Sequence, residues 1–204
     1  MKYVDLTRTI TPDLPGWPND PPFKLEQIVK YGFVVDNILH SGMHVGTHID
    51  VAKHMVEGGK SLCEYPPEKF MGRGVLVDAR DKKIIDVDCL DNITFCSGDI
   101  VLVLTGRDGL FGKPEYFEEY PVITEAFAHI LVQSNVKIIG LDSPSPDKYP
   151  FPVHKILLSN DVLIIEMLTN VDALLNIQTF NVIALPPKFD TAGSFVRVIA
   201  SYEE

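Results

Sequence analysis

The sequence has no long hydrophobic run. Its longest apolar stretches, such as VLIIEML at 162–168, are too short and too interrupted to span a bilayer, and the first ten residues lack the apolar region of a signal peptide. The cysteines are odd in number and form no CxxC pair: Cys63, Cys89 and Cys96. We therefore expect a cytoplasmic protein that has free thiols and does not associate with a membrane.

Basic runs and several common motifs are also missing. The formal net charge of −10 disfavours nucleic acid and anionic membranes as partners. Because the chain has no GxGxxG, no GxxxxGK[ST] and no G-x-S-x-G, nucleotide cofactors and an α/β-hydrolase mechanism lack their usual sequence signals. No linker or internal repeat divides the 204 residues, so we expect a single domain over 1–204.

Four polar residues instead crowd one short segment, HVGTHIDVAKH: His44, His48, Asp50 and His54. Imidazole nitrogen and carboxylate oxygen are ligands that zinc, manganese and iron accept, and a site without thiolate is more often catalytic than structural. The spacing differs from the helical HExxH motif, because Val45 follows the first histidine where that motif has glutamate. The segment therefore predicts metal-assisted chemistry.

The same segment alternates between two kinds of residue. From 44 to 51 the even positions hold the candidate ligands and a glycine, and the odd positions hold valine, threonine and isoleucine. A strand would place the ligands on one face. A straight strand would separate the Cα atoms of His44 and His48 by about 13 Å, whereas two imidazoles on one tetrahedral ion need about 10 Å. We therefore predict a strand bent at Gly42 or Gly46, with a short turn or helix leading to His54.

The remaining pattern predicts a mixed α and β fold. We expect strands near 3–10, 33–38, 42–50, 74–79, 99–105, 136–141, 161–167, 180–185 and 195–201, and helices near 86–92, 123–134, 153–159 and 171–176. Several strands are short apolar runs of the buried type, and the helix at 123–134 lies between two of them. This order predicts at least one crossover connection between parallel strands.

HVGTHIDVAKH resembles the HxGTHxDxxxH signature of the cyclase family, whose members include kynurenine formamidases and isatin hydrolases. VDLTRTITPDLPGWPNDPPF resembles the opening segment of the family. IGLDSPSPD, PFPVHKILLSNDVLIIEMLTNVD and ALPPKFDTAGSFVRVIA are similar to its later blocks, in the same order. Val51 and Ala52 stand where the family commonly has Ala-Pro, and Met55 where phenylalanine or leucine is common. The resemblance implies the family's swivelling β/β/α fold.

The resemblance also implies two divalent ions bridged by Asp50, with these ligands: His44, His48, Asp50, His154 and Glu166. It assigns His54 as the general acid/base beside them. From the residues alone, His154 could equally lie on the surface and Glu166 could form an ion pair. His40 and His129 match nothing in the family and are expected to be structural. The polar cluster at Asp142, Ser143, Ser145 and Asp147 fits turn and capping roles at least as well as a site role.

The activity implied is hydrolysis of a C–N amide bond in a small formamide or cyclic amide by metal-activated water. It is most like the arylformamidase reaction of tryptophan catabolism, N-formylkynurenine to kynurenine and formate. Hydrolysis of an isatin-like lactam or cyclic imide, and metal-dependent binding or regulation without turnover, remain open alternatives. Zinc is the expected metal, with manganese or iron as alternatives.

Aromatic and flexible side chains are the candidates for substrate contacts. We expect Trp17 and Met55 to line the substrate pocket, with Tyr31 and Phe33 on neighbouring loops. The hydrophobic content of 46% and these aromatic loops predict a homodimer or homotetramer, as the family commonly forms.

Overall fold

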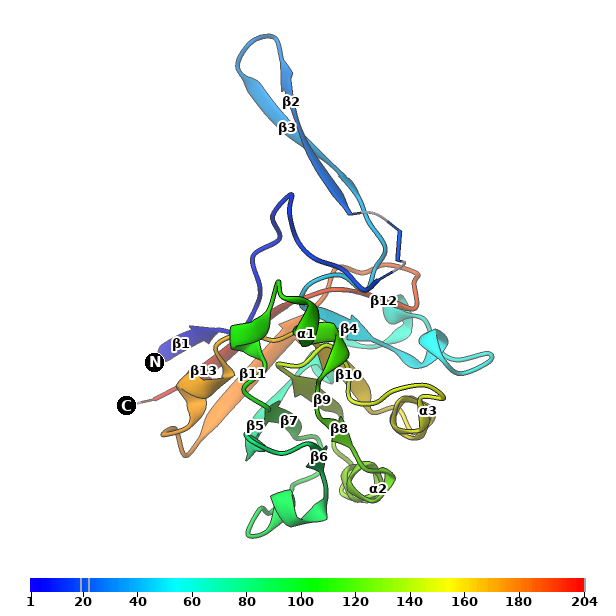
Figure 1. The fold of residues 1–204 in the computed structure, drawn as a ribbon, viewed down its shortest axis with the longest axis vertical. Helices are drawn as coiled ribbons and strands as arrows, with labels where there is room; N and C mark the ends of the chain where they lie inside the picture. The colour runs from blue at the N-terminus through cyan, green and yellow to red at the C-terminus, as the bar shows by residue number, and fades with distance from the viewer. Residues whose placement is uncertain (19, 22, 204) are drawn as a thin grey trace.

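A curled sheet of nine strands forms the centre of the computed structural model, which describes residues 1–18, 20–21 and 23–203 (Figure 1). The strands lie in the order β1 (Lys2–Asp5), β13 (Arg197–Tyr202), β11 (Phe180–Leu185), β5 (Met71–Asp78), β7 (Ile100–Leu104), β9 (Ile138–Leu141), β10 (Leu163–Glu166), β4 (His48–Asp50) and β12 (Gly193–Phe195). In the proline-rich segment around Trp17, the residues Asn19 and Pro22 lie outside the described part of the chain. The fold is mixed α and β, as the sequence predicts.

The middle of the sheet is parallel. Strands β5, β7, β9 and β10 pair in parallel, and the strands on both sides of them are antiparallel. Helix α2 (Glu125–Gln133) connects β7 to β9, and α3 (Pro152–Ser159) connects β9 to β10. The Thr124 side chain caps α2 by accepting a hydrogen bond from the Phe127 N–H. The predicted crossover is therefore confirmed, and α3 forms a second one.

The central strands are apolar throughout because both faces of the sheet are covered. Along β7, Ile100, Leu102 and Leu104 belong to one hydrophobic cluster, whereas Val101 and Val103 belong to the other. The second cluster also contains the buried faces of α2 and α3, which cover this side of the sheet. This two-sided burial explains why these strands appear in the sequence as short continuous apolar runs.

Two small pairings lie outside the large sheet. β6 (Ile84–Ile85) pairs with β8 (Val122–Ile123), and β2 (Lys24–Lys30) pairs with β3 (Val34–His40) in a long hairpin that projects from the body (Figure 1). The connections also contain α1 (Pro114–Glu118) and short 3-10 turns at Ala52–His54, Leu62–Glu64, Pro67–Phe70, Val87–Leu90, Asp108–Leu110 and Val171–Leu174. Within the described residues, every helix is too short or too polar to cross a membrane.

Several predicted elements differ from the structure. The strand expected over 42–50 is shortened to β4, because Gly46 takes a positive φ of 60° and turns the chain just before it. The helices expected at 86–92 and 171–176 are short 3-10 segments, and β2, β12 and α1 were not predicted. The three cysteines are free thiols, as expected.

Candidate metal centre

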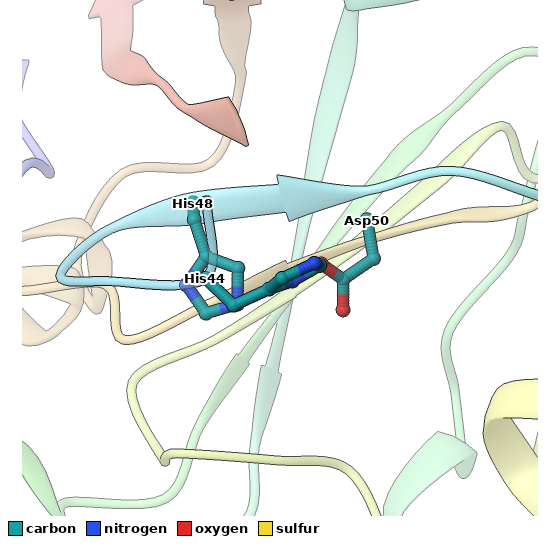
Figure 2. A group of neighbouring side chains, drawn as sticks. All are labelled: His44, His48 and Asp50. Carbon is teal, nitrogen blue, oxygen red and sulfur yellow. The ribbon is translucent and has the colours of Figure 1, made fainter. Parts of the chain in front are cut away.

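A turn at Gly46 brings His44 back beside Asp50. Its left-handed backbone lets the loop before β4 reverse, so that His44 Nδ1 lies 2.6 Å from Asp50 Oδ1. The side chains of His48 and Asp50 leave the same side of β4 and face His44 (Figure 2). The intervening Ile49 is fully buried in the hydrophobic cluster on the other side. The predicted bend and the predicted face are therefore both present, although His44 lies in a loop rather than on the strand.

The pairing of β4 with β10 brings a fourth polar side chain, Glu166, to the cluster. Glu166 lies directly opposite His48 in this antiparallel pair, with His48 Nε2 3.2 Å from Glu166 Oε2. Directly opposite residues of neighbouring strands project from the same face of the sheet, so one register places both side chains in the same space. Glu166 is buried at the end of β10, as its apolar sequence context predicts.

His154 approaches from the first turn of α3. Its Nε2 atom lies 3.3 Å from Glu166 Oε1 and 3.8 Å from Asp50 Oδ2. The other oxygen of Asp50, Oδ1, lies 3.6 Å from His48 Nε2. Asp50 therefore belongs to two ligand sets, His44–His48–Asp50 and Asp50–His154–Glu166, in each of which the donor atoms lie within 4.8 Å of one another.

The residues in these sets fit a divalent cation. Among the described residues, His48 Nε2 and Glu166 Oε1 are two of four buried side-chain atoms without a well-directed hydrogen bond, although they lie 3.2 Å from Glu166 Oε2 and 3.3 Å from His154 Nε2, respectively. Buried polar atoms normally have one, because leaving them unpaired costs about 1–3 kcal/mol. Nitrogen and oxygen donors without thiolate suit zinc, manganese or iron. One or two ions at this position would satisfy both atoms.

Two residues that support the cluster were missed by the sequence interpretation. Gly193 on β12 pairs with Asp50, and a Cβ atom there would lie 2.8 Å from His44 Cε1 and 2.7 Å from the Ile49 carbonyl oxygen. Only glycine allows this close approach. Asp147 caps α3 by accepting from the Val153 and His154 backbone N–H groups, which agrees with the capping role that the sequence offered, and it also accepts from the ring of His154 at 2.6 Å, which the sequence did not predict. In the sequence, the signal for the capping role is that Asp147 precedes a helix that begins at a proline.

His54 lies beside the ligand sets but belongs to neither. It ends the 3-10 turn Ala52–His54, which agrees with the short turn or helix predicted after Asp50. Its ring centroid lies 4.2 Å from that of His44 and 6.3 Å from that of His154. His40 and His129 are exposed and lie on β3 and α2, outside both ligand sets.

The cluster opens into a cavity of about 500 Å³. Trp17 and Met55 are among the residues that line it, and Trp17 is held by ring contacts with Phe117 at 5.3 Å and Tyr120 at 6.1 Å. The remaining wall is also largely aromatic, with Tyr120, Tyr149 and Phe151.

The expectation that Tyr31 and Phe33 lie near this pocket is wrong for a single chain. They are 88% and 79% exposed at the turn between β2 and β3, and neither lines the cavity. The reason is the unpredicted hairpin, which carries this turn away from the body of the protein (Figure 1).

Comparison with known proteins agrees with the fold and with the sequence motif. The model of the Cyclase family matches residues 4–148. The chain belongs to the Cyclase family. It is 34% identical to the uncharacterized protein MJ0783 of Methanocaldococcus jannaschii, over 98% of this chain and 99% of that protein. It is 25% identical to the kynurenine formamidase of Bacillus mycoides, with 97% and 96% covered. The structure of isatin hydrolase A from Ralstonia solanacearum superimposes with a TM-score of 0.86 at 25% identity, covering 98% of this chain and 91% of that one.

Burial and opposite charge together set the pKa values in this Cyclase-family cluster. Burial alone would favour neutral histidines, but the nearby carboxylates of Asp50 and Glu166 raise the pKa of His48 to about 9. Burial likewise opposes the charge of His154, yet Asp147 and Glu166 raise its pKa to about 10. Against the effect of their own burial, the neighbouring histidines lower the pKa values of Asp50 and Glu166. Without a cation, protons on His48 and His154 therefore balance the buried carboxylates.

These shifts predict how the stability of the metal-free protein depends on pH. The folded pKa values of about 9 and 10 exceed the ordinary value of 6.5, so the stabilisation is complete below pH 6.5 and is lost as the pH rises toward 10. The melting temperature of chelator-treated protein should fall over this range by several degrees, on the order expected for a few kcal/mol. Protein supplied with a divalent cation is the control, because an ion held by these residues would replace the protons. Equal falls in the two forms would contradict the prediction.

Proposed function

We propose that this protein is a metal-dependent hydrolase that cleaves the C–N bond of a small formamide or cyclic amide. One observation carries this proposal: two ligand sets share Asp50 at the floor of an open cavity, and His54 lines the same cavity without joining either set. A structural metal site is normally closed by protein ligands, whereas a catalytic site leaves room for water and substrate. The hydrolase names of the relatives support the same reaction class.

His44, His48 and Asp50 would hold one ion, and Asp50, His154 and Glu166 the second. We propose zinc, with manganese or iron as alternatives, because the donors are imidazole and carboxylate. A divalent ion supplies Lewis-acid chemistry: it lowers the pKa of a bound water toward about 7 and polarises a carbonyl oxygen. The buried side chains of the two sets would hold the ions at the cavity, and a neighbouring side-chain group there can move a proton.

His54 is that group. Burial lowers its pKa below the ordinary value; the charges of His44 and His154 add to this effect, and those of Asp50 and Glu166 oppose it only in part, so its imidazole is mainly neutral at pH 7. A neutral ring nitrogen can accept a proton from the attacking water and then donate it to the departing nitrogen of the substrate. We therefore assign His54 as the general acid/base.

The cavity favours an aromatic amide. Trp17, Tyr149 and Phe151 offer ring surfaces along its walls, onto which a flat substrate can pack. Lys148 and Asp20 also line it, and their opposite charges suit the carboxylate and ammonium groups of an amino-acid substrate. We therefore place an arylformamide such as N-formylkynurenine first among substrates, and an isatin-like lactam or a cyclic imide second.

The proposed reaction can be tested with a panel of arylformamides, lactams and cyclic imides, assayed with and without a chelator. We expect turnover that the chelator abolishes and zinc restores. Asp50→Ala should lose both metal content and turnover, because this carboxylate belongs to both ligand sets. His40→Ala, which changes an exposed histidine on β3, is the matched control and should keep both. Saturable ligand binding without turnover across the panel would support a binding protein instead.

A second variant separates proton transfer from metal binding. His54→Ala should keep near-normal zinc content, since His54 belongs to neither ligand set, and should lower kcat by about 10²–10⁴-fold through loss of the general acid/base. Zinc content by elemental analysis and kcat on the best substrate of the panel provide the measurements. If His54→Ala emptied a metal site as fully as His48→Ala, His54 would be a ligand and another group would carry the proton.

We also propose that the protein is a homo-oligomer, with a dimer as the simplest closed form and a tetramer as the alternative. The β2–β3 hairpin supports this proposal. It carries exposed apolar residues such as Val29, Val35 and Ile38, which are 53%, 59% and 39% exposed. An isolated two-stranded hairpin is marginally stable in water, so a second copy of the chain packing on it would stabilise it.

Light scattering can test this assembly at micromolar concentration. The unaltered chain should be a dimer or tetramer, and Val35→Lys should shift it toward monomer because a charge replaces a valine on the proposed contact surface. Ile84→Lys is a matched control, since Ile84 is 58% exposed on β6, outside the hairpin. A monodisperse monomer of the unaltered chain would exclude the assembly.

A further inference from the structure

Asp147 is a buried carboxylate that the proposed reaction does not use, yet it contacts His154 in two ways. Its Oδ2 atom accepts hydrogen bonds from the backbone N–H groups of Val153 at 2.7 Å and His154 at 3.1 Å, at the start of α3. Its Oδ1 atom lies 2.6 Å from Nδ1 of the His154 ring. Asp147 is only 3% exposed. One side chain therefore fixes both the backbone and the ring of a proposed ligand.

Asp147 is itself held in place. The Tyr120 hydroxyl donates to the Asp147 carbonyl oxygen at 2.9 Å, and the Asp147 N–H donates to Ser145 Oγ at 3.4 Å. Tyr120 and Ser145 also line the cavity. These two contacts fix the backbone of Asp147, and the hydrogen bonds that Oδ2 accepts from Val153 and His154 hold the carboxylate itself beside the His154 ring.

This geometry selects one tautomer of His154. An ionised carboxylate only accepts hydrogen bonds, so the ring nitrogen facing it, Nδ1, must carry the hydrogen. In the neutral ring, the lone pair is then on Nε2, the atom that lies 3.3 Å from Glu166 and 3.8 Å from Asp50. In His48 the Gly46 carbonyl oxygen lies 2.8 Å from Nδ1 and selects the same tautomer. Because this acceptor belongs to the backbone, no side-chain substitution can remove it.

We propose that Asp147 is a positioning residue that prepares His154 to bind the ion of the Asp50–His154–Glu166 set. The inference rests on the proposed metal site and adds a specific consequence: Asp147 sets the metal affinity of one ligand set and leaves the other nearly unchanged. A carboxylate behind a metal-binding histidine fixes its tautomer and makes it a stronger donor, and loss of such a partner typically weakens metal binding about 10–100-fold.

Two variants separate this role from helix capping. Asp147→Asn keeps the size of the side chain but has one oxygen where three N–H groups now converge, so its amide group either leaves a cap bond unmade or forces the wrong tautomer on His154. Asp147→Ser can still cap α3 but is too short to reach the ring. Thr124→Ala is the matched control, because it removes a capping bond from α2, to the Phe127 N–H, and touches neither ligand set.

Zinc titration of the metal-free protein against a competing chelator measures the two affinities. We expect Asp147→Asn and Asp147→Ser to weaken one of two zinc-binding steps by about 10–100-fold, with the other within a few-fold of the unaltered chain. Thr124→Ala should lower the melting temperature without changing either step. Equal weakening of both steps, unchanged affinities, or the same change in Thr124→Ala would overturn the proposal.

Nuclear magnetic resonance gives a readout that does not depend on activity. The ring N–H of His154 bonded to Asp147 should give a downfield, slowly exchanging proton signal, assigned by its loss in His154→Ala. The signal should disappear in Asp147→Ser, and its persistence there would overturn the proposal. If the unaltered chain shows this signal but binds no zinc, the proposed metal site fails while the Asp147–His154 bond stands.

Discussion

The structure around the site depends on compensating the buried negative charge of Asp50. This carboxylate is 1% exposed, and the carboxylate of Glu166 is buried in the same space. An uncompensated buried charge is too costly to persist, so something cationic must lie between them. In the metal-free protein the protonated rings of His48 and His154 fill that role, which is why their pKa values rise to about 9 and 10. A divalent ion bound by the same side chains would satisfy this requirement with a larger charge.

Three distant parts of the chain meet this requirement together. The loop and strand at 44–50 carry the first ligand set, and the unit β9–α3–β10 carries His154 and Glu166, one at the start of its helix and the other at the end of its second strand. Strand β12 then closes against β4, where Gly193 leaves the space that His44 occupies. Three of these side chains, His48, Asp50 and Glu166, lie on paired strands of the sheet, whereas His44 lies in the loop before β4 and His154 on α3.

The sequence predicts the local part of this arrangement well and the long-range part poorly. Alternation of residue types from 44 to 51 identifies the shared face of His48 and Asp50, and the distance argument correctly requires a bend, which Gly46 provides. The continuous apolar runs predict the central parallel strands, because a strand that is apolar on both faces must be buried whichever strand it pairs with. Spacing could not reveal Gly193, because its role lies in the absence of a side chain beside His44, and it could not reveal the ring contact of Asp147, because this contact depends on how the loop before α3 folds back seven residues later. The strand expected near 33–38 is β3, but β2 and its pairing with β3 were missed, because the apolar residues of this hairpin face solvent in a single chain and show no buried pattern.

Burial lowers the pKa of all three histidines, but nearby carboxylates outweigh this effect at His48 and His154 and do not at His54. This difference divides the work among them. His48 and His154 each face carboxylates at close range, so the opposite charges outweigh their desolvation. The carboxylates of Asp50 and Glu166 also act on His54, but they only partly offset its desolvation and the charges of the two neighbouring imidazoles, so the neutral form is favoured. Adding a divalent ion would remove the protons from the ligands and add positive charge near His54, which strengthens the same difference. Metal binding and the readiness of His54 to accept a proton at neutral pH are therefore consequences of one arrangement of charges.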